Sequence, residues 1–177
     1  MQYQKFDSFF KKTKLSNQNQ IIFFDLFINR IFYKMDAFKV NERSFYNQNE
    51  ESVILNFIHR QGGPEIKIKV DKFEVYIWIE NFGYSAFQIS KKENFSDEFF
   101  EDIICFLEYA FSGNFKQEFY YYKDELVKSR IIWKINKFPE SIYMPLKHLF
   151  FEKLKIRKYK LKRIKEFPSF FSNDIDF

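Results

Sequence analysis

The chain has few of the residues that break or cross-link a fold. Its 177 residues include four Gly, four Pro and a single cysteine, Cys105. No internal disulfide is therefore possible, and a reducing, cytoplasmic location is expected. Aromatic residues make up 23% of the chain and include 27 Phe. Such a chain has ample apolar surface to bury, which argues against disorder and favours a packed domain.

Several function classes lack their sequence signature. There is no Gly-rich phosphate loop and no GxGxxG pattern. Two histidines, His59 and His148, cannot complete a usual zinc set with one cysteine. We therefore expect neither a metal nor another cofactor. The most apolar stretch, residues 21–33, is interrupted by charged and amide side chains and is shorter than the ~20 residues of a membrane span. No signal peptide is expected either.

Charge is unevenly distributed along the chain. The net charge is +5, yet residues 1–146 contain 20 basic and 20 acidic residues. Residues 147–166 contain nine basic residues and two acidic ones, whereas residues 93–125 contain nine acidic and two basic ones. A molecule with one acidic and one basic region should orient charged partners.

The clearest predicted element is a helix over residues 97–112. Ser96 is an N-cap candidate, and Phe95 and Phe100 have the spacing of a hydrophobic staple. Gly113 is placed as a left-handed stop. One apolar stripe runs between these ends: Phe99, Phe100, Ile103, Ile104, Leu107, Ala110 and Phe111.

The N-terminal third is predicted to be helical, with a loose arm over residues 1–16. Apolar residues recur at helical spacing between Gln18 and Phe38 and form a predicted core stripe. The polar, Asn-rich residues 39–49 indicate a loop. Residues 50–60 carry the β-branched content of a strand, but also helix-end signals at both ends, and we favour a short helix.

Alternation with period two predicts two hairpins. In the first, Asp71 and Lys72 form a two-residue turn that pairs Val70 with Phe73, Lys69 with Glu74 and Ile68 with Val75, followed by a third strand at 84–90. The second pairs residues 115–123 with 126–135 around Asp124 and Glu125. The basic residues 153–165 suit either an edge strand or a basic helix.

These elements predict an α+β fold in a single domain, 1–177. The expected order is α-α-β-β-β-α-β-β-β, with an antiparallel sheet of about five to six strands. The 97–112 helix packs on one face of the sheet, accompanied by the N-terminal helices. Residues 147–166 form a basic C-terminal element.

Two surfaces are candidates for binding a partner protein. The first is the acidic face of the predicted helix, although such residues are also typical of ordinary solvated charge: Asp97, Glu98, Glu101, Asp102 and Glu108. The second is the non-aliphatic sheet face, rich in the residue types of binding hot spots, unless the 18–38 helix covers it: Tyr76, Trp78, Tyr120, Tyr122, Lys128, Arg130 and Lys134.

The same sheet face and the basic C-terminal element offer an alternative, nucleic-acid binding. Aromatic rings can stack on bases, and cations can contact phosphate. The basic candidates are Lys155, Arg157, Lys158, Lys160, Lys162 and Arg163. An enzyme is a third possibility, because carboxylate pairs such as Glu98 with Asp102 can act as acid and base. Cys105 lies among apolar residues, which favours an inert thiol.

Part of the chain resembles a known class of proteins. The run FLEYAFSGNFKQEFYYYKDELVKSRIIWK (106–134), preceded by VYIWIEN (75–81), is similar to stretches in small bacterial immunity proteins of polymorphic-toxin and contact-dependent inhibition systems. The resemblance covers about a third of the chain and carries no catalytic motif. It implies a cytoplasmic, non-enzymatic protein that binds and neutralises one cognate toxin domain. The basic net charge differs from the acidic character common among nuclease inhibitors, so the acidic helix would have to contact a nuclease.

Overall fold

The computed structural model describes most of the chain between residues 15 and 172. The described residues are 15, 17–48, 52–71, 74–80, 82–88, 97–134, 138, 141–144, 148 and 159–172. The predicted arm at residues 1–16 lies almost entirely outside them, as does the predicted N-cap Ser96.

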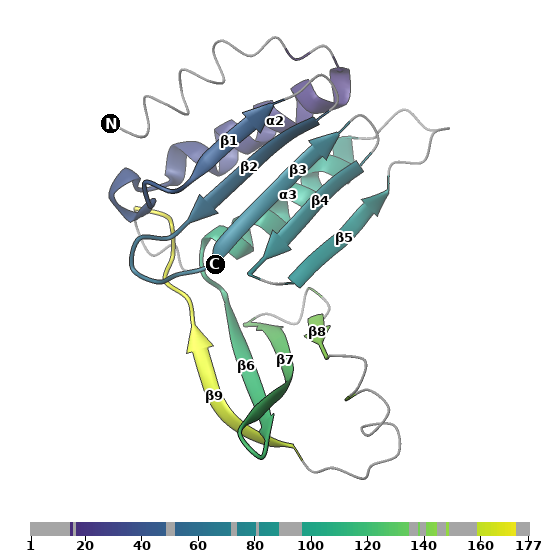
Figure 1. Ribbon diagram of the computed structural model, residues 1–177. Coiled ribbons are helices and arrows are strands. Elements are labelled where there is room, and N and C mark those ends of the chain that lie inside the picture. Colours follow the sequence, from purple (N-terminus) through teal and green to yellow (C-terminus); the bar gives the residue numbers. More distant parts are fainter. Residues whose placement is uncertain are drawn as a thin grey trace. The chain divides into compact units, whose positions relative to one another are not determined.

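The contacts of the chain group into two compact units. The first consists of Met1–Ser112 and Pro168–Phe177, and the second of Gly113–Phe167. The second unit is therefore an insertion in the sequence of the first. Each unit has its own antiparallel sheet, of five and four strands. The predicted α+β class is confirmed, with the strands divided between two sheets (Figure 1).

The first unit combines two helices, two short 3₁₀ turns and a meander of five strands. Each strand pairs with the next in chain order. The elements are α2 (Gln18–Arg30), η1 (Phe32–Lys34), η2 (Ala37–Lys39), β1 (Phe45–Gln48), β2 (Ser52–Ile58), β3 (Glu65–Asp71), β4 (Glu74–Ile79), β5 (Phe82–Gln88) and α3 (Asp97–Phe111).

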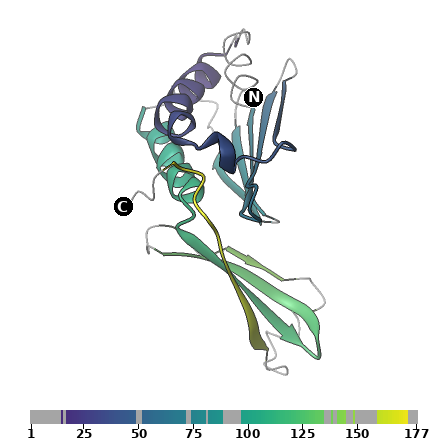
Figure 2. The same cartoon turned by 90° about the vertical axis from the view of Figure 1, so that its left-hand side faces the viewer.

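Both helices lie on the same face of this sheet, as Figure 2 shows. Phe27 of α2 contacts Phe57 of β2, with ring centroids 5.9 Å apart, and Phe57 contacts Phe111 of α3 at 5.2 Å. The aliphatic residues that alternate along β3 and β4 are buried beneath the helices. The predicted 97–112 helix is thus confirmed, and the positive φ of Gly113, 70°, confirms its left-handed stop.

The helix predicted between Gln18 and Phe38 is shorter than expected. It ends at Arg30 and is followed by η1 and η2, with an extended residue, Met35, that forms a β-bridge with Phe171. Pairing with this C-terminal residue competes with helix continuation. The prediction that Phe38 belongs to the core stripe is wrong, since its side chain is 81% exposed.

The favoured helix at residues 50–60 is also wrong, because Ser52–Ile58 forms β2 between β1 and β3. Val53, Leu55 and Phe57 alternate onto the helix-covered face and are buried. Pairing on both edges outweighs the helix-end signals. The predicted loop at 39–49 likewise contains β1, a strand of four residues.

The first hairpin is confirmed, but its register is shifted. Val70 pairs with Val75 and Ile68 with Ile77, and β3 ends at Asp71 while β4 begins at Glu74, so the turn lies one residue later in the chain than expected. The Asp71 carboxylate accepts a hydrogen bond from the backbone N–H of Glu74 at 2.7 Å, which joins the two strand ends. Because the shift is even, the aliphatic residues remain on one face. The predicted pair of Lys69 with Glu74 is replaced by Lys69 opposite Tyr76.

After the insertion, residues 168–172 return to the first unit. Phe170 and Phe171 are fully buried. The backbone N–H of Phe170 donates to Phe111 O at 2.8 Å, and the N–H of Asp36 donates to Phe170 O at 2.8 Å. These bonds join the C-terminal residues to α3 and to the segment after α2.

The second unit is a four-stranded antiparallel sheet in the order β8-β7-β6-β9. Its strands are β6 (Phe115–Tyr122), β7 (Glu125–Trp133), β8 (Ser141–Tyr143) and β9 (Lys160–Glu166). The predicted second hairpin is confirmed. Lys123 and Asp124 both have positive φ, as a tight two-residue hairpin turn requires, and the turn is one residue earlier than expected. The described part of the 153–165 segment is a strand, paired with β6.

Candidate functional site

The acidic face of α3 is only partly available to a partner. Asp102 and Glu101 are exposed, whereas Glu108 is buried. The side chains of Asp97 and Glu98 lie outside the described residues, although their backbone belongs to α3.

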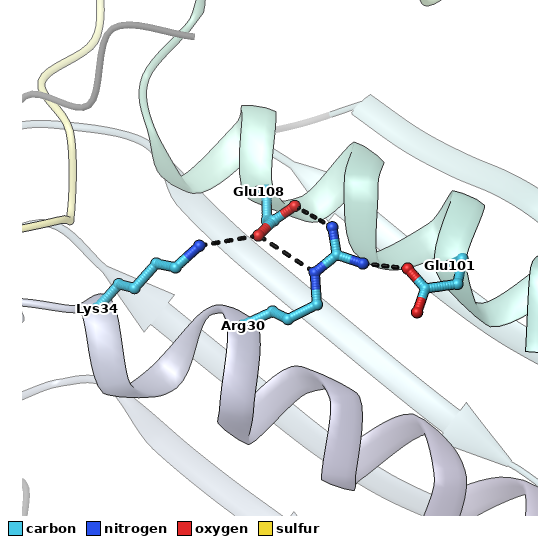
Figure 3. A network of polar contacts seen from close by, with 4 residues as sticks. All are labelled: Arg30, Lys34, Glu101 and Glu108. Carbon is cyan, nitrogen blue, oxygen red and sulfur yellow. Dashed lines mark hydrogen bonds and ion pairs between the residues drawn. The ribbon is translucent and has the colours of Figure 1, made fainter.

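Glu101 and Glu108 are both paired with cations from the segment around the end of α2 (Figure 3). Arg30 Nε and Nη2 donate to the two oxygens of Glu108 at 3.3 and 2.5 Å, and Arg30 Nη1 donates to Glu101. Lys34 Nζ is 3.1 Å from Glu108 Oε1. The hydrogen bond with Glu108 is the main influence that raises the pKa of Arg30.

This ion-pair cluster holds the two helices of the first unit together. Glu108 is buried and bonded on both oxygens, so it does not present a free carboxylate. Glu101 shares the same arginine. The sequence could not show this, because Arg30 and Glu108 are 78 residues apart. Among the members of the predicted acidic surface whose side chains are described, Asp102 and the exposed part of Glu101 stay available to a partner, whereas Glu108 does not.

The outer face of the first sheet carries Tyr76 and Trp78. Their rings are stacked, with centroids 5.7 Å apart and planes at 18°. Lys67 Nζ lies 5.4 Å from the Trp78 ring centroid, and Lys69 Nζ lies 5.3 Å from that of Tyr76. Because α2 packs on the opposite face, the possibility that it covers these rings is excluded. The rings are half-buried against one another and against the lysine side chains.

The prediction of one continuous aromatic sheet face is wrong. Tyr76 and Trp78 belong to the first unit, whereas Tyr120, Tyr122, Lys128 and Arg130 belong to the second. The two hairpins have similar alternation, but they belong to different sheets. Alternation identifies the face on which a residue lies and does not identify the sheet to which its strand belongs.

One face of the second sheet brings polar and aliphatic side chains into register. Arg130 of β7 lies opposite Glu118 of β6 and Ile142 of β8, and Glu118 lies opposite Ile164 of β9. We call this surface the Arg130 face. Its members are Lys116, Glu118, Tyr120, Tyr122, Lys128, Arg130, Ile132, Ile142, Leu161 and Ile164.

Glu118 is the polar centre of the Arg130 face. Its side chain is nearly buried and accepts hydrogen bonds from Tyr120 Oη at 2.6 Å and Arg130 Nε at 2.8 Å, with Lys116 Nζ at 3.3 Å. Burial opposes ionisation of this carboxyl, but the three donors outweigh it, and the pKa of Glu118 is lowered. The pKa of Tyr120 is raised, mainly because burial disfavours its charged form and also because its hydroxyl donates a hydrogen bond to Glu118.

Two cationic side chains also lie close to the ring of Tyr120, which donates to Glu118. The guanidinium carbon of Arg130 lies 5.5 Å from the Tyr120 ring centroid, and Lys128 Nζ lies 5.9 Å from it. Tyr120 is thus held at its hydroxyl and approached at its ring by two cations. Side chains that are ordered before binding lose less entropy when a partner docks.

Exposed aliphatic side chains flank this polar centre. Ile142 is 56% exposed, Ile164 50% and Leu161 45%. The opposite face of the same sheet is the core of the unit and buries, among others, Phe115, Ile131 and Trp133. None of these three aliphatic residues belongs to the surfaces predicted from the sequence. Leu161 and Ile164 are three residues apart, so alternation alone would place them on opposite faces; the register shift of β9 opposite Phe119 and Tyr120 brings both to the Arg130 face. Ile142 lies in an irregular stretch of the sequence without a pattern.

The basic C-terminal candidates are divided between described and undescribed residues. Lys160, Lys162 and Arg163 lie on β9, and the Lys160 and Arg163 side chains are exposed. The guanidinium of Arg163 lies 5.7 Å from the Phe119 ring centroid. Lys155, Arg157 and Lys158 lie outside the described residues.

Both histidines are buried in the part of the chain that is described. His59 is buried, its Nδ1 accepts from the N–H of Gln61 at 3.2 Å, and its Nε2 is 3.2 Å from Ser169 O. His148 is buried 3.4 Å from Glu125 Oε1. Within the described residues, no three His, Cys, Asp or Glu side chains form a group that could hold a metal ion. No helix there is long and apolar enough to cross a membrane.

The Arg130 face and the ion-pair cluster of α2 and α3 are two polar networks in the described part of the chain. The cluster holds two helices together, whereas the Arg130 face is open to solvent and flanked by exposed aliphatic side chains. Comparison of the chain with protein-family models, curated proteins and solved structures found no match.

Proposed function

We propose that this chain is a cytoplasmic immunity protein, which binds a cognate bacterial toxin domain through the Arg130 face and neutralises it by contact alone, without catalysis. The observation that carries the proposal is the open sheet face on which Ile142, Leu161 and Ile164 surround an ordered Arg and Tyr. Arg and Tyr are enriched in binding hot spots, and clustered exposed aliphatic side chains are typical of contact surfaces.

The arrangement has the anatomy of a protein-binding surface. The central carboxylate of Glu118 is already neutralised by its donors, so a docking partner does not leave an unpaired buried charge. The aliphatic side chains supply apolar area at the flanks. Tyr120 is held in place and requires little further ordering.

Nucleic-acid binding is supported less well on this face. The Tyr120 hydroxyl and Arg130 Nε already donate to the Glu118 carboxylate, so these two donors are engaged and less available to a phosphate. Base stacking does not need the exposed Ile and Leu side chains. On the first sheet, Tyr76 and Trp78 stack on one another, so each ring has one face less for a base.

Calorimetric titration with the protein encoded by the adjacent upstream gene tests the proposal. We expect that protein to be a toxin and to bind the intact chain. The double variant Ile142→Asp/Ile164→Asp should weaken binding by at least about 30-fold, the loss of roughly 2 kcal/mol typical of one hot spot. Phe38→Asp, at an apolar site of the first unit that is more exposed than either isoleucine, is the control and should bind normally.

Two results would contradict the proposal. If the intact chain does not bind the product of the neighbouring gene, the immunity function is wrong. If the intact chain binds and the double variant binds equally well, the Arg130 face is not the contact surface.

A further inference from the structure

The two units carry opposite net charge. Gly113–Phe167 contains 15 Lys and Arg against six Asp and Glu, a net charge of +9 over 55 residues. The remainder of the chain contains 14 basic and 18 acidic residues, a net charge of −4, and the two values account for the overall +5. The insertion is therefore a strongly basic unit within the sequence of a mildly acidic one.

Part of the basic charge of the second unit is exposed in the residues that the structure describes. Lys123, Lys134, Lys160 and Arg163 are exposed in the described strands and turns. Of the described carboxylates of this unit, Asp124, Glu125 and Glu166 are exposed, whereas Glu118 is buried and bonded to three donors. The 15 basic residues of the unit outnumber its six carboxylates. A positive potential therefore extends from the rim of this unit into solvent.

We infer that the partner of the second unit is a protein with an acidic surface around an apolar centre. The inference rests on the proposed function and specifies the chemistry of the partner. The apolar centre corresponds to Ile142, Leu161 and Ile164 on the Arg130 face. The acidic surface corresponds to the net positive charge of the unit, to which Lys160 and Arg163 contribute from the opposite face of β9. The partner chemistry is the reverse of that expected for a basic, nucleic-acid-degrading toxin domain, which an acidic inhibitor would suit.

Charge complementarity of this kind acts mainly on the association rate. Opposite potentials steer two proteins together over about a Debye length, ~10 Å at 0.1 M salt, and can raise association rates by ~10- to 10³-fold. The rate should therefore fall steeply with salt. The dissociation rate depends on the contacts at the centre of the face and should change little.

Stopped-flow association with the product of the adjacent upstream gene tests the inference. Lys160→Glu/Arg163→Glu changes the net charge by −4 on the second unit, and Arg43→Glu/Arg60→Glu makes the same change at exposed positions of the first. At 20 mM salt we expect the first variant to associate at least about tenfold more slowly and the control within about twofold of the intact chain. Lys123→Glu/Lys134→Glu is a second test pair, used if the β9 variant fails to fold.

The outcomes separate this inference from the proposed function. No binding by the intact chain overturns both. Binding with equal rates for both charge variants, or with no salt dependence, overturns the acidic-partner inference alone. A 30-nucleotide oligo(dT) serves as the nucleic-acid probe. If the intact chain binds this oligonucleotide at micromolar concentration and the Lys160→Glu/Arg163→Glu variant does not, the ligand is a nucleic acid and the inference is wrong.

Discussion

The two carboxylates that bind Arg30 differ in burial and therefore in their expected contribution to stability. Glu101 and Glu108 extend from the same helix to the same guanidinium. The Glu108 side chain is 9% exposed and the Glu101 side chain 47%. Changing each to Gln removes one negative charge from α3 with almost no change in volume, so the pair forms a matched comparison.

The magnitudes follow from the hydrogen bonds that each carboxylate accepts. A hydrogen bond to a charged group contributes about 1.5–3 kcal/mol, whereas an exposed ion pair contributes about 0–1 kcal/mol. Glu108 accepts from Arg30 and Lys34, which are themselves 33% and 38% exposed, so solvent screens part of the attraction. We expect Glu108→Gln to lower the free energy of unfolding of the first unit by about 2 kcal/mol. Glu101→Gln should lower it by less than about 0.5 kcal/mol.

Each unit contains one tryptophan, which allows the first unit to be followed alone. In a Trp133→Phe background, the fluorescence of Trp78 reports its unfolding in urea. With a slope of about 1–3 kcal/mol per molar urea, Glu108→Gln should lower the midpoint by about 1 M. Equal midpoint shifts for the two variants would refute the reasoning, because burial would then have no influence on the strength of the pair.

Two further predictions concern pH. His59 is neutral and bonded on both ring nitrogens, and burial lowers its pKa. In the unfolded chain the pKa of His59 is about 6.5. As the pH falls below this value, His59 binds a proton in the unfolded chain and stays neutral in the folded one. The first unit should therefore lose stability from pH 7 to 5, and His59→Gln should reduce that loss in urea titrations. The lowered pKa of Glu118 acts in the same direction at lower pH: its contribution is present above about pH 4.5 and is lost as pH falls through its folded pKa. Glu118→Gln should destabilise the second unit by about 2 kcal/mol at pH 7 and by progressively less as pH falls below about 4.5, with Trp133 as reporter in a Trp78→Phe background. A Glu118→Gln effect that does not change with pH would contradict this.

Local patterns predicted much of the fold because local physics decides those elements. The α3 helix has an apolar stripe and a glycine stop, and both hairpins have clean alternation. The errors occur where distant residues compete. Met35 pairs with Phe171 and shortens the preceding helix, while Ser52–Ile58 is paired on both edges despite its helix-end signals. Neither partner can be identified from the local sequence.

The candidate site was predicted in part for the same reason. Tyr120, Lys128 and Arg130 were assigned to one face correctly, since pairing within a hairpin is local. Their separation from Trp78 was not foreseeable, because it depends on the division of strands between two sheets. The removal of Glu108 from the acidic surface depends on Arg30, which packs against it from another helix.

Side-chain oxidation by hydroxyl radicals, measured with and without the product of the adjacent upstream gene, tests the central claim most directly. Ile142, Leu161 and Ile164 report the Arg130 face, while Tyr33 and Phe38, which are at least as exposed, report the first unit. If the Arg130 face is the contact surface, the partner should slow oxidation of the three aliphatic side chains and leave Tyr33 and Phe38 unchanged. Protection of Tyr33 and Phe38 with none at Ile142, Leu161 and Ile164 would contradict the account.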